Sequence, residues 1–170
     1  MKNPSPHLPR NSSSTHDAAY RPCVGMAIFN HDGFILVAER IDHPGNWQMP
    51  QGGIDADESP EVAVFREMEE EIGTRNAKII GTLDEWISYD FPPHIIKKLN
   101  TDYRGQRQKW IALRFMGQDH EIQLEAHSHP EFSQWKWIPI NKLLDYVVPF
   151  KREVYARIMQ EFEKYAVKSG

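Results

Sequence analysis

The chain has 170 residues, of which 40% are hydrophobic and 26% charged, which is enough apolar mass for one globular domain with its own core. A net charge of −4 excludes a protein that attracts polyanions through a global positive field, so a phosphate site must be a local basic patch. The single cysteine, Cys23, excludes an intrachain disulfide framework. The sequence has no apolar run near the roughly 20 residues of a membrane span and no secretory signal, so we expect a cytoplasmic protein.

The first part of the chain predicts a tail followed by a hairpin. Residues 1–19 are rich in proline and serine and predict a flexible tail. Residues 23–30 predict a buried strand, which a short turn connects to a returning strand over residues 34–40. The loops that follow end at Gly52 and Gly53, where the backbone can turn sharply or approach a ligand.

The next segment carries the signals of one helix. Ser59 is a suitable N-cap, Pro60 fits the first helical position and Gly73 is a natural stop. One arc of this helix is apolar and should face a core, and it contains Val64, Phe65, Met68 and Ile72.

The adjacent arc of the same helix is acidic. Glu67, Glu70 and Glu71 share it with only Ala63 among them. Like charges at this spacing repel by about 0.2–0.5 kcal/mol per exposed pair, so the cluster destabilises the helix unless a cation binds to it. We interpret it as a site for Mg²⁺ or Mn²⁺, with Ala63 leaving room for the ligand, and the plain alternative is a solvated acidic face.

The second part of the chain predicts more strands and a final helix. Residues 95–99 predict a short helical turn, and Pro149 opens a helix with an apolar stripe at mostly four-residue spacing. Two principal helices and a mixed β-sheet predict an α/β fold, arranged as an α/β/α sandwich over residues 20–166, with 167–170 as a C-terminal tail. The predicted strands cover residues 77–81, 83–89, 108–116, 121–124 and 132–138.

The spacing around the acidic helix resembles the Nudix box. Gly52 is followed after five residues by Glu58, and after seven more by the pair Arg66-Glu67, with Glu70-Glu71 and Gly73 completing the pattern. Other segments are similar to the bacterial RNA pyrophosphohydrolases of the alpha-proteobacterial type, which are also described as dinucleoside polyphosphate hydrolases. These segments are YRPCVG at 20–25, WQMPQGG at 47–53, GQRQKW at 105–110, PEF at 130–132 and VPFKR at 148–152.

The resemblance implies an enzyme that acts on phosphoanhydride bonds. The expected reaction is metal-dependent removal of pyrophosphate from the 5′-triphosphate end of RNA, a step that promotes RNA decay. Hydrolysis of dinucleoside polyphosphates is the alternative, because the metal chemistry is shared. An alternative of another class is a catalytically silent Nudix fold that senses nucleotides. The resemblance implies no DNA or membrane partner and leaves the oligomeric state open.

The resemblance also implies which residues hold the metal. Glu67, Glu70, Glu71 and the remote Glu131 are the expected ligands of two or three Mg²⁺ or Mn²⁺ ions. Glu70 or Glu131 is the expected general base, and the residues do not decide between them. Arg66 is expected to orient the box carboxylates, with Glu58 as its partner and Gly73 as a structural member of the box. Glu131 taken alone could be a surface loop carboxylate, but its position between Pro130 and Phe132 favours the functional role.

Substrate contacts are implied in the same way. Arg21 and Lys151 are expected near the phosphates, and Gly52 and Gly53 let the backbone approach them. A pocket for a base at the RNA 5′ end is expected from Arg40, Val148 and Phe150. The plain alternatives are a surface role for Arg21 and a core role for Val148 and Phe150. The basic residues Lys97, Lys98, Arg104, Arg107 and Lys109 could form a rim, or could simply be solvated.

Overall fold

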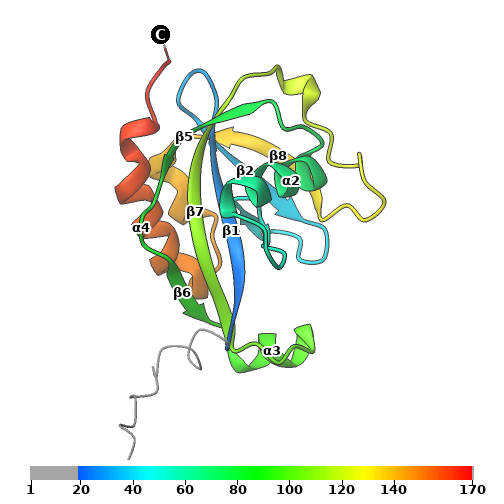
Figure 1. Ribbon diagram of the computed structural model, residues 1–170. Helices are drawn as coiled ribbons and strands as arrows, with labels where there is room; N and C mark the ends of the chain where they lie inside the picture. Colours follow the sequence, from blue (N-terminus) through cyan, green and yellow to red (C-terminus); the bar gives the residue numbers. More distant parts are fainter. Residues whose placement is uncertain (1–18, 170) are drawn as a thin grey trace, which may run out of the picture.

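The computed structural model describes residues 19–169, so the tail predicted over residues 1–19 lies outside the described residues except for Ala19. The mixed β-sheet at its centre has the strand order β3-β2-β1-β7-β5, with β4 and β6 pairing with β1 and β7, and β8 with β2 (Figure 1). The strands are β1 (Tyr20–Phe29), β2 (Ile35–Arg40), β3 (Trp47–Gln48), β4 (Gln51–Gly53), β5 (Ala77–Thr82), β6 (Ile87–Asp90), β7 (Gly105–Phe115) and β8 (Phe132–Ile138).

The central pair of strands explains why the sheet is mixed. β1 and β7 run parallel over ten register pairs, from Tyr20 opposite Gly105 to Phe29 opposite Arg114. All the other pairings are antiparallel. Successive side chains of a strand point to opposite faces, so each of these two long, mostly buried strands supplies both faces of the sheet with core residues.

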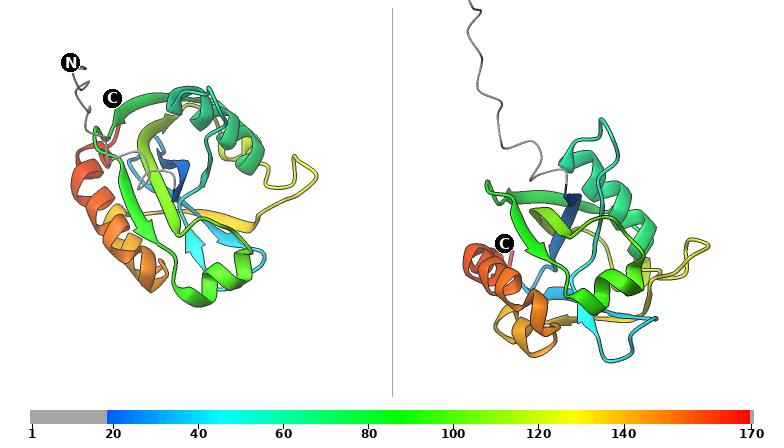
Figure 2. Two further views of the ribbon diagram at one scale, coloured as in Figure 1. Left: turned by 60° about the horizontal axis from the view of Figure 1, so that its bottom comes forward. Right: turned by 90° about the horizontal axis from the view of Figure 1, so that it is seen from below.

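One helix packs on each face of the sheet (Figure 2). Helix α2 (Pro60–Ile72) contributes Val64, Met68 and Ile72 to one hydrophobic cluster. Helix α4 (Arg152–Phe162) contributes Ile158 and Phe162 to the other. The predicted α/β/α sandwich is therefore confirmed. None of the described helices is long and apolar enough to cross a membrane.

Helix α2 begins and ends at the residues that the capping signals predict. The Ser59 hydroxyl accepts a hydrogen bond from the Val62 backbone N–H at 3.2 Å, and Pro60 occupies the first turn. Gly73 adopts the left-handed conformation at φ 77°, and its N–H donates to the Glu69 carbonyl at 2.9 Å. These caps fix the register at which the helix presents its carboxylates to the sheet.

Several expectations about local structure are wrong. Of the strand predicted over residues 83–89, only residues 87–89 are in a strand, because residues 83–86 form a bend between β5 and β6. Residues 121–124 form no strand. Glu121 ends a 3-10 turn, Asp119–Glu121, which a capping box between Gln118 and Glu121 closes. Ala63 does not leave room for a ligand, because it is fully buried in the cluster beneath α2.

The remaining elements are short. Helix α3 (Pro93–Leu99) connects β6 to β7, and a 3-10 turn, Pro149–Lys151, precedes α4 where we predicted a continuous helix. Two further 3-10 turns, Ile140–Asp145 and Glu163–Tyr165, lie on either side of α4 along the chain. In the predicted C-terminal tail, the Ser169 N–H donates to the His31 carbonyl at 2.9 Å.

Candidate active site

Arg66 organises the acidic side of α2. Its Nε and Nη2 atoms donate to the two carboxylate oxygens of Glu58, both at 2.8 Å, and Nη2 also donates to the Gly53 carbonyl at 2.9 Å. Its Nη1 atom donates to Glu67 at 2.9 Å and more weakly to Glu70 at 3.3 Å. Hydrogen bonds from Arg66 lower the pKa of Glu58 to about 2. One guanidinium thus joins the loop before the helix, strand β4 and two helix carboxylates.

Glu71, one turn further along α2, lies in the opposite situation. Its side chain is buried, and its Oε2 atom has no hydrogen-bond partner among the described residues. Burial raises the pKa of Glu71 well above its ordinary value, and the nearby charges of Glu131 and Glu67 raise it further. A buried carboxylate with an unpaired oxygen needs either a proton or a cation.

Glu67 lies directly against strand β4. A side chain at Gly52 would overlap with the Glu67 carboxylate, so only glycine allows the helix to approach the strand this closely. Burial raises the pKa of Glu67, although its hydrogen bond to Arg66 opposes the rise. The carboxylates of Glu67 and Glu71 are therefore held near each other by the backbone of β4 rather than by side-chain cations alone.

Glu70 and Glu131 are the more exposed members of the predicted metal set. The Glu70 side chain is 48% exposed. Glu131 precedes β8, and its carbonyl accepts the Ile41 N–H at 3.0 Å, which fixes its loop beside β2. Its charge is felt by Glu67, Glu71 and Arg40, so the structure brings the remote carboxylate to the helix cluster.

The four carboxylates fit a hard divalent cation by donor chemistry, although they do not form a closed ligand shell. Within residues 19–169, no three acidic, histidine or cysteine side chains are arranged so that they could hold a metal ion as they stand. The fit rests on the unpaired Glu71 oxygen and on an all-oxygen donor set, which suits Mg²⁺ and Mn²⁺.

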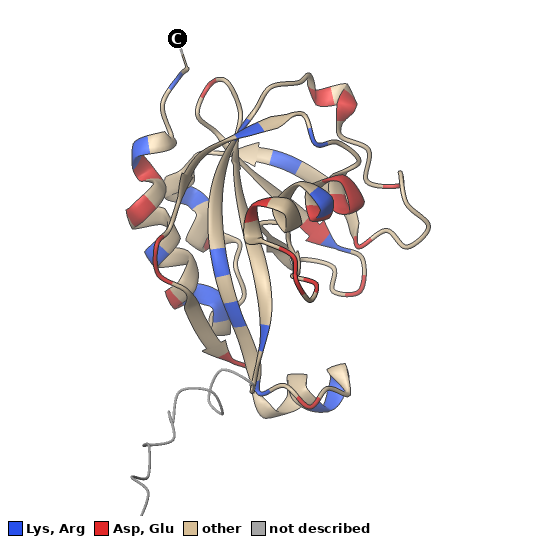
Figure 3. Cartoon of the chain, viewed as in Figure 1, with Lys and Arg blue, Asp and Glu red and all other residues tan. Residues whose placement is uncertain are grey.

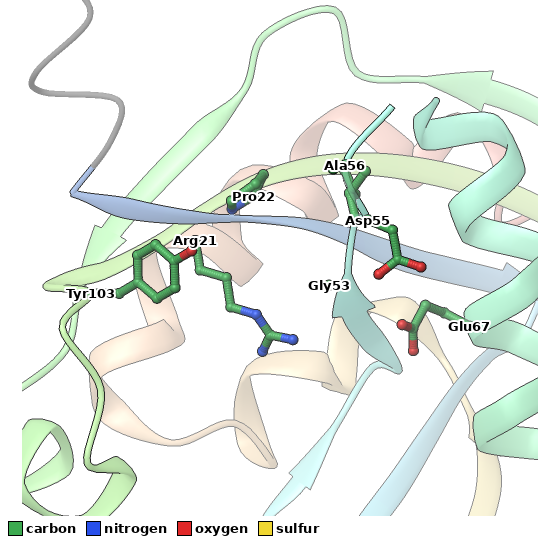
Figure 4. A pocket seen from close by; sticks show the side chains of 8 residues that line it. Arg21, Pro22, Gly53, Asp55, Ala56, Glu67 and Tyr103 are labelled. Carbon is green, nitrogen blue, oxygen red and sulfur yellow. The ribbon is translucent and has the colours of Figure 1, made fainter. Parts of the chain in front are cut away.

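A cavity of about 510 Å³ opens beside Glu67 (Figure 4). Arg21 from β1 extends its guanidinium toward Gly53, and Tyr103 lies near the base of the arginine. A cation and a carboxylate that face one space suit a phosphate chain bridged to a metal. The cavity is lined by Arg21, Pro22, Gly53, Ile54, Asp55, Ala56, Glu67 and Tyr103.

The other two predicted cations, Arg40 and Lys151, lie near Glu71. Arg40 makes two hydrogen bonds to Asp42, at 2.8 and 2.9 Å. Lys151 is buried, its Nζ atom lies 3.3 Å from the Gln48 side-chain oxygen, and burial lowers its pKa to about 8. Both cations interact electrostatically with Glu71, so positive charge lies close to the acidic cluster.

The predicted base pocket is only partly formed by the predicted residues. Val148 and Phe150 are half-buried, and neither belongs to a described hydrophobic cluster, so they are not simply core residues. The Phe150 ring packs against the Tyr89 ring, with their centroids 6.0 Å apart. Phe150 is also close to Lys151, whose Nζ atom lies 5.8 Å from the ring centroid.

Sequence reasoning missed a polar network beside this pocket. Gln106 and Gln108 from β7 are buried and bond to Gln51 from β4, at distances of 2.8 to 3.0 Å. The Tyr89 hydroxyl donates to Gln106 at 2.9 Å, and the Trp110 ring N–H donates to Gln108 at 2.9 Å. The available signal was the alternation of β7, which places two glutamines on the face of a buried tryptophan.

Comparisons with known proteins agree on one family. Residues 19–158 match the NUDIX domain family. A protein named RNA pyrophosphohydrolase from Acidiphilium cryptum is 48% identical to this chain, over 89% of this chain and 94% of its own length. Another with this name, from Rhodospirillum rubrum, is also 48% identical, over 94% of this chain and 96% of its own length. A third with this name, from Rickettsia prowazekii, is 47% identical over 91% of this chain and 97% of its own length.

Solved structures show the same fold at low sequence identity. The Escherichia coli dihydroneopterin triphosphate pyrophosphohydrolase superimposes with a TM-score of 0.63 at 15% identity, covering 84% of this chain and 98% of that one. A Caenorhabditis elegans Ap4A hydrolase complex superimposes with a TM-score of 0.60 at 17% identity, covering 84% and 96%. These likenesses support the fold alone.

Proposed function

This chain belongs to the NUDIX family, and we propose that it is a metal-dependent enzyme that removes pyrophosphate from the 5′-triphosphate end of RNA. The observation that carries the proposal is the buried Glu71 carboxylate, which has an unpaired oxygen and lies near Glu67 and Glu131. The cavity of about 510 Å³ that is lined by Arg21 opens beside Glu67. The whole-length identity with proteins named RNA pyrophosphohydrolase supports RNA as the substrate.

Glu67, Glu70, Glu71 and Glu131 would hold Mg²⁺ or Mn²⁺, and we propose two or three ions. The metal supplies neutralisation of phosphate charge and a lower pKa for water bound to it. Arg66 positions the carboxylates, since it bonds Glu67 directly and ties the helix to Glu58 and β4. This arrangement keeps the two buried carboxylates oriented before the substrate arrives.

The proton of the attacking water goes to Glu70 or Glu131. Both are accessible to solvent, whereas Glu67 and Glu71 are largely enclosed. Substituting each with glutamine separates the two, because loss of the base lowers kcat by about 100-fold or more. Loss of a metal ligand instead raises the Mg²⁺ concentration needed for half-maximal rate.

Substrate phosphates would lie between the acidic cluster and the basic side chains of Arg21 and Lys151. The first base would rest against Phe150, bounded by Val148 and Arg40, with Gly52 and Gly53 allowing close backbone approach. The products would be 5′-monophosphorylated RNA with pyrophosphate, or with two phosphates released in steps.

A side-by-side rate comparison with Mg²⁺ tests the proposal. The substrates are triphosphorylated RNA, diphosphorylated RNA and diadenosine tetraphosphate. We expect kcat/KM to be higher for the two RNAs than for diadenosine tetraphosphate. Efficient cleavage of the dinucleotide with intact RNA would favour the dinucleoside polyphosphate hydrolase. A protein inert on all substrates with both Mg²⁺ and Mn²⁺ would favour a nucleotide sensor.

A further inference from the structure

Helix α2 covers only part of its face of the sheet. The apolar residues Ile111 and Leu113 of β7 lie in the cluster beneath the helix. Strand alternation places Arg107 and Lys109 on the same face, nearer the start of β7. Figure 3 shows basic segments on this part of β7 and on β1, whereas acidic segments gather on α2 and the loop before it. Two regions of opposite charge thus share one face.

Trp86 joins the two basic side chains. The Arg107 guanidinium carbon lies 4.1 Å from the Trp86 ring centroid, and the Lys109 Nζ atom lies 5.8 Å from it and donates to the Asp84 carbonyl at 2.7 Å. All three side chains are half-buried, and Trp86 belongs to neither hydrophobic cluster of the described residues. Within the described residues, the tryptophan therefore packs against cations and is not part of the hydrophobic core.

This surface continues into the cavity of the candidate site. Arg107 lies opposite Pro22 in the β1–β7 register. Pro22 is exposed and lines the cavity together with Arg21 and Tyr103. We call Trp86, Arg107 and Lys109 the β6–β7 strip. Arg21 precedes Pro22 on β1 and points to the opposite face of the sheet, so the strip meets the cavity at Pro22.

We propose that the β6–β7 strip binds the single-stranded RNA chain downstream of the 5′ end. Single-strand binding surfaces combine aromatic side chains, on which bases stack, with cations that follow the phosphates, and the strip offers both. With a net charge of −4, the protein attracts RNA through such local patches. The inference rests on the proposed function, because it requires a substrate longer than the nucleotides held in the site.

The test compares two substrates, a triphosphorylated RNA dinucleotide and a triphosphorylated unstructured dodecanucleotide, with the full chain at fixed Mg²⁺ and pH. For wild type we expect a higher kcat/KM on the longer RNA. Trp86→Ala should lower kcat/KM on the longer RNA about tenfold and on the dinucleotide less than about twofold, because only the longer chain reaches the ring. Trp86→Phe, which keeps a stacking surface, should retain most of the length preference.

Arg107→Gln provides an independent measurement that leaves the tryptophan in place. Losing one phosphate contact should reduce the slope of log kcat/KM against log salt by about 0.7 on the longer RNA only. Arg75→Gln is the matched control, since Arg75 is exposed near the end of α2 and pairs with Glu69 at 2.7 Å. Circular dichroism melts verify that each variant folds.

The outcomes separate the strip from the active site. Equal losses on both RNAs, or an unchanged length preference in folded Trp86→Ala and Arg107→Gln, would overturn the strip while leaving the proposed function intact. A wild type that cleaves neither RNA but cleaves diadenosine tetraphosphate would overturn the proposed function, and the strip with it.

Discussion

The two ends of the acidic segment place similar carboxylates in contrasting surroundings. Glu58 receives two hydrogen bonds from Arg66, and they lower its pKa to about 2. Glu71 is buried with an unpaired oxygen, and its pKa is raised. Arg66 satisfies the carboxylate at the entry to the helix. At the far turn, Arg40 and Lys151 interact with Glu71 only electrostatically, and no described residue donates a hydrogen bond to its Oε2 atom. The contrast indicates that Arg66 is a structural counter-ion, whereas the unpaired oxygen of Glu71 is available to bind a cation from outside the chain.

The largest effect is expected from Glu71→Gln, which removes the unpaired carboxylate but keeps its volume. Loss of a metal ligand should lower kcat on triphosphorylated RNA by about 1,000-fold. The metal-free variant should also melt about 2–4 °C higher than wild type, because removing an unfavourable buried charge stabilises the fold by about 1 kcal/mol. Steady-state kinetics and metal-free calorimetry measure the two effects. A variant that loses activity and melts lower would contradict the contrast with Glu58.

Arg66→Lys tests the other side of the comparison. A lysine keeps the charge but cannot make the forked bonds to Glu58 together with those to Gly53 and Glu67. We expect a loss of about 1–3 kcal/mol in the free energy of unfolding and a fall in kcat of about 10- to 100-fold. Urea unfolding and kinetics provide both values. Unchanged stability would show that the fork does not organise the site.

Lys151 should give a smaller effect that appears only at alkaline pH. Its pKa is lowered to about 8, so the amine loses its charge as pH rises through that value. KM for triphosphorylated RNA should therefore rise by about three- to tenfold above that pH, because a phosphate contact is lost. Lys151→Gln should show a high KM at every pH. A wild-type KM independent of pH between neutral and strongly alkaline solution would remove Lys151 from the phosphate site.

The smallest effect concerns stability in acid. The folded pKa of Glu58 is below its ordinary value, so its contribution is present above about pH 4.5 and is lost as pH falls toward about 2. Glu71 has the opposite sign, since its folded pKa is raised and its protonation in acid favours the metal-free fold. In urea titrations, Glu58→Gln should flatten the loss of stability between about pH 4.5 and about 2. Glu71→Gln should instead abolish a gain in stability that the metal-free wild type shows as pH falls toward about 4.5. Identical curves for the two variants would refute the assignment of opposite signs.

The sequence predicted the frame of the molecule well because caps and periodicity are local. Ser59, Pro60 and Gly73 fixed the ends of α2, and alternating strands with two amphipathic helices predicted the sandwich that the structure confirms. The family likeness to Nudix RNA pyrophosphohydrolases was also correct, because it rests on motifs spread along the chain. The cytoplasmic location, the number of metal ions and the individual site roles stay predictions.

The parts that failed or were missed depend on tertiary contacts. A helical wheel placed Ala63 among the glutamates, yet the helix packs so that Ala63 is buried beneath it together with Glu71. The glutamine network requires β4, β6 and β7 to meet, which no local pattern encodes. Arg66 bonds to Glu58 and leaves the Glu71 oxygen unpaired because of the register at which the helix packs against β4, and this register is a tertiary feature.

Titration of Mn²⁺ followed by electron paramagnetic resonance tests the central claim most directly. The proteins are wild type, Glu71→Gln and the matched control Glu69→Gln, whose carboxylate lies on the same helix but pairs with Arg75 on the surface. The account predicts saturable Mn²⁺ binding by wild type and the control, and at least a tenfold weaker affinity in Glu71→Gln. Equal affinity in all three proteins, or no binding by wild type, would contradict it.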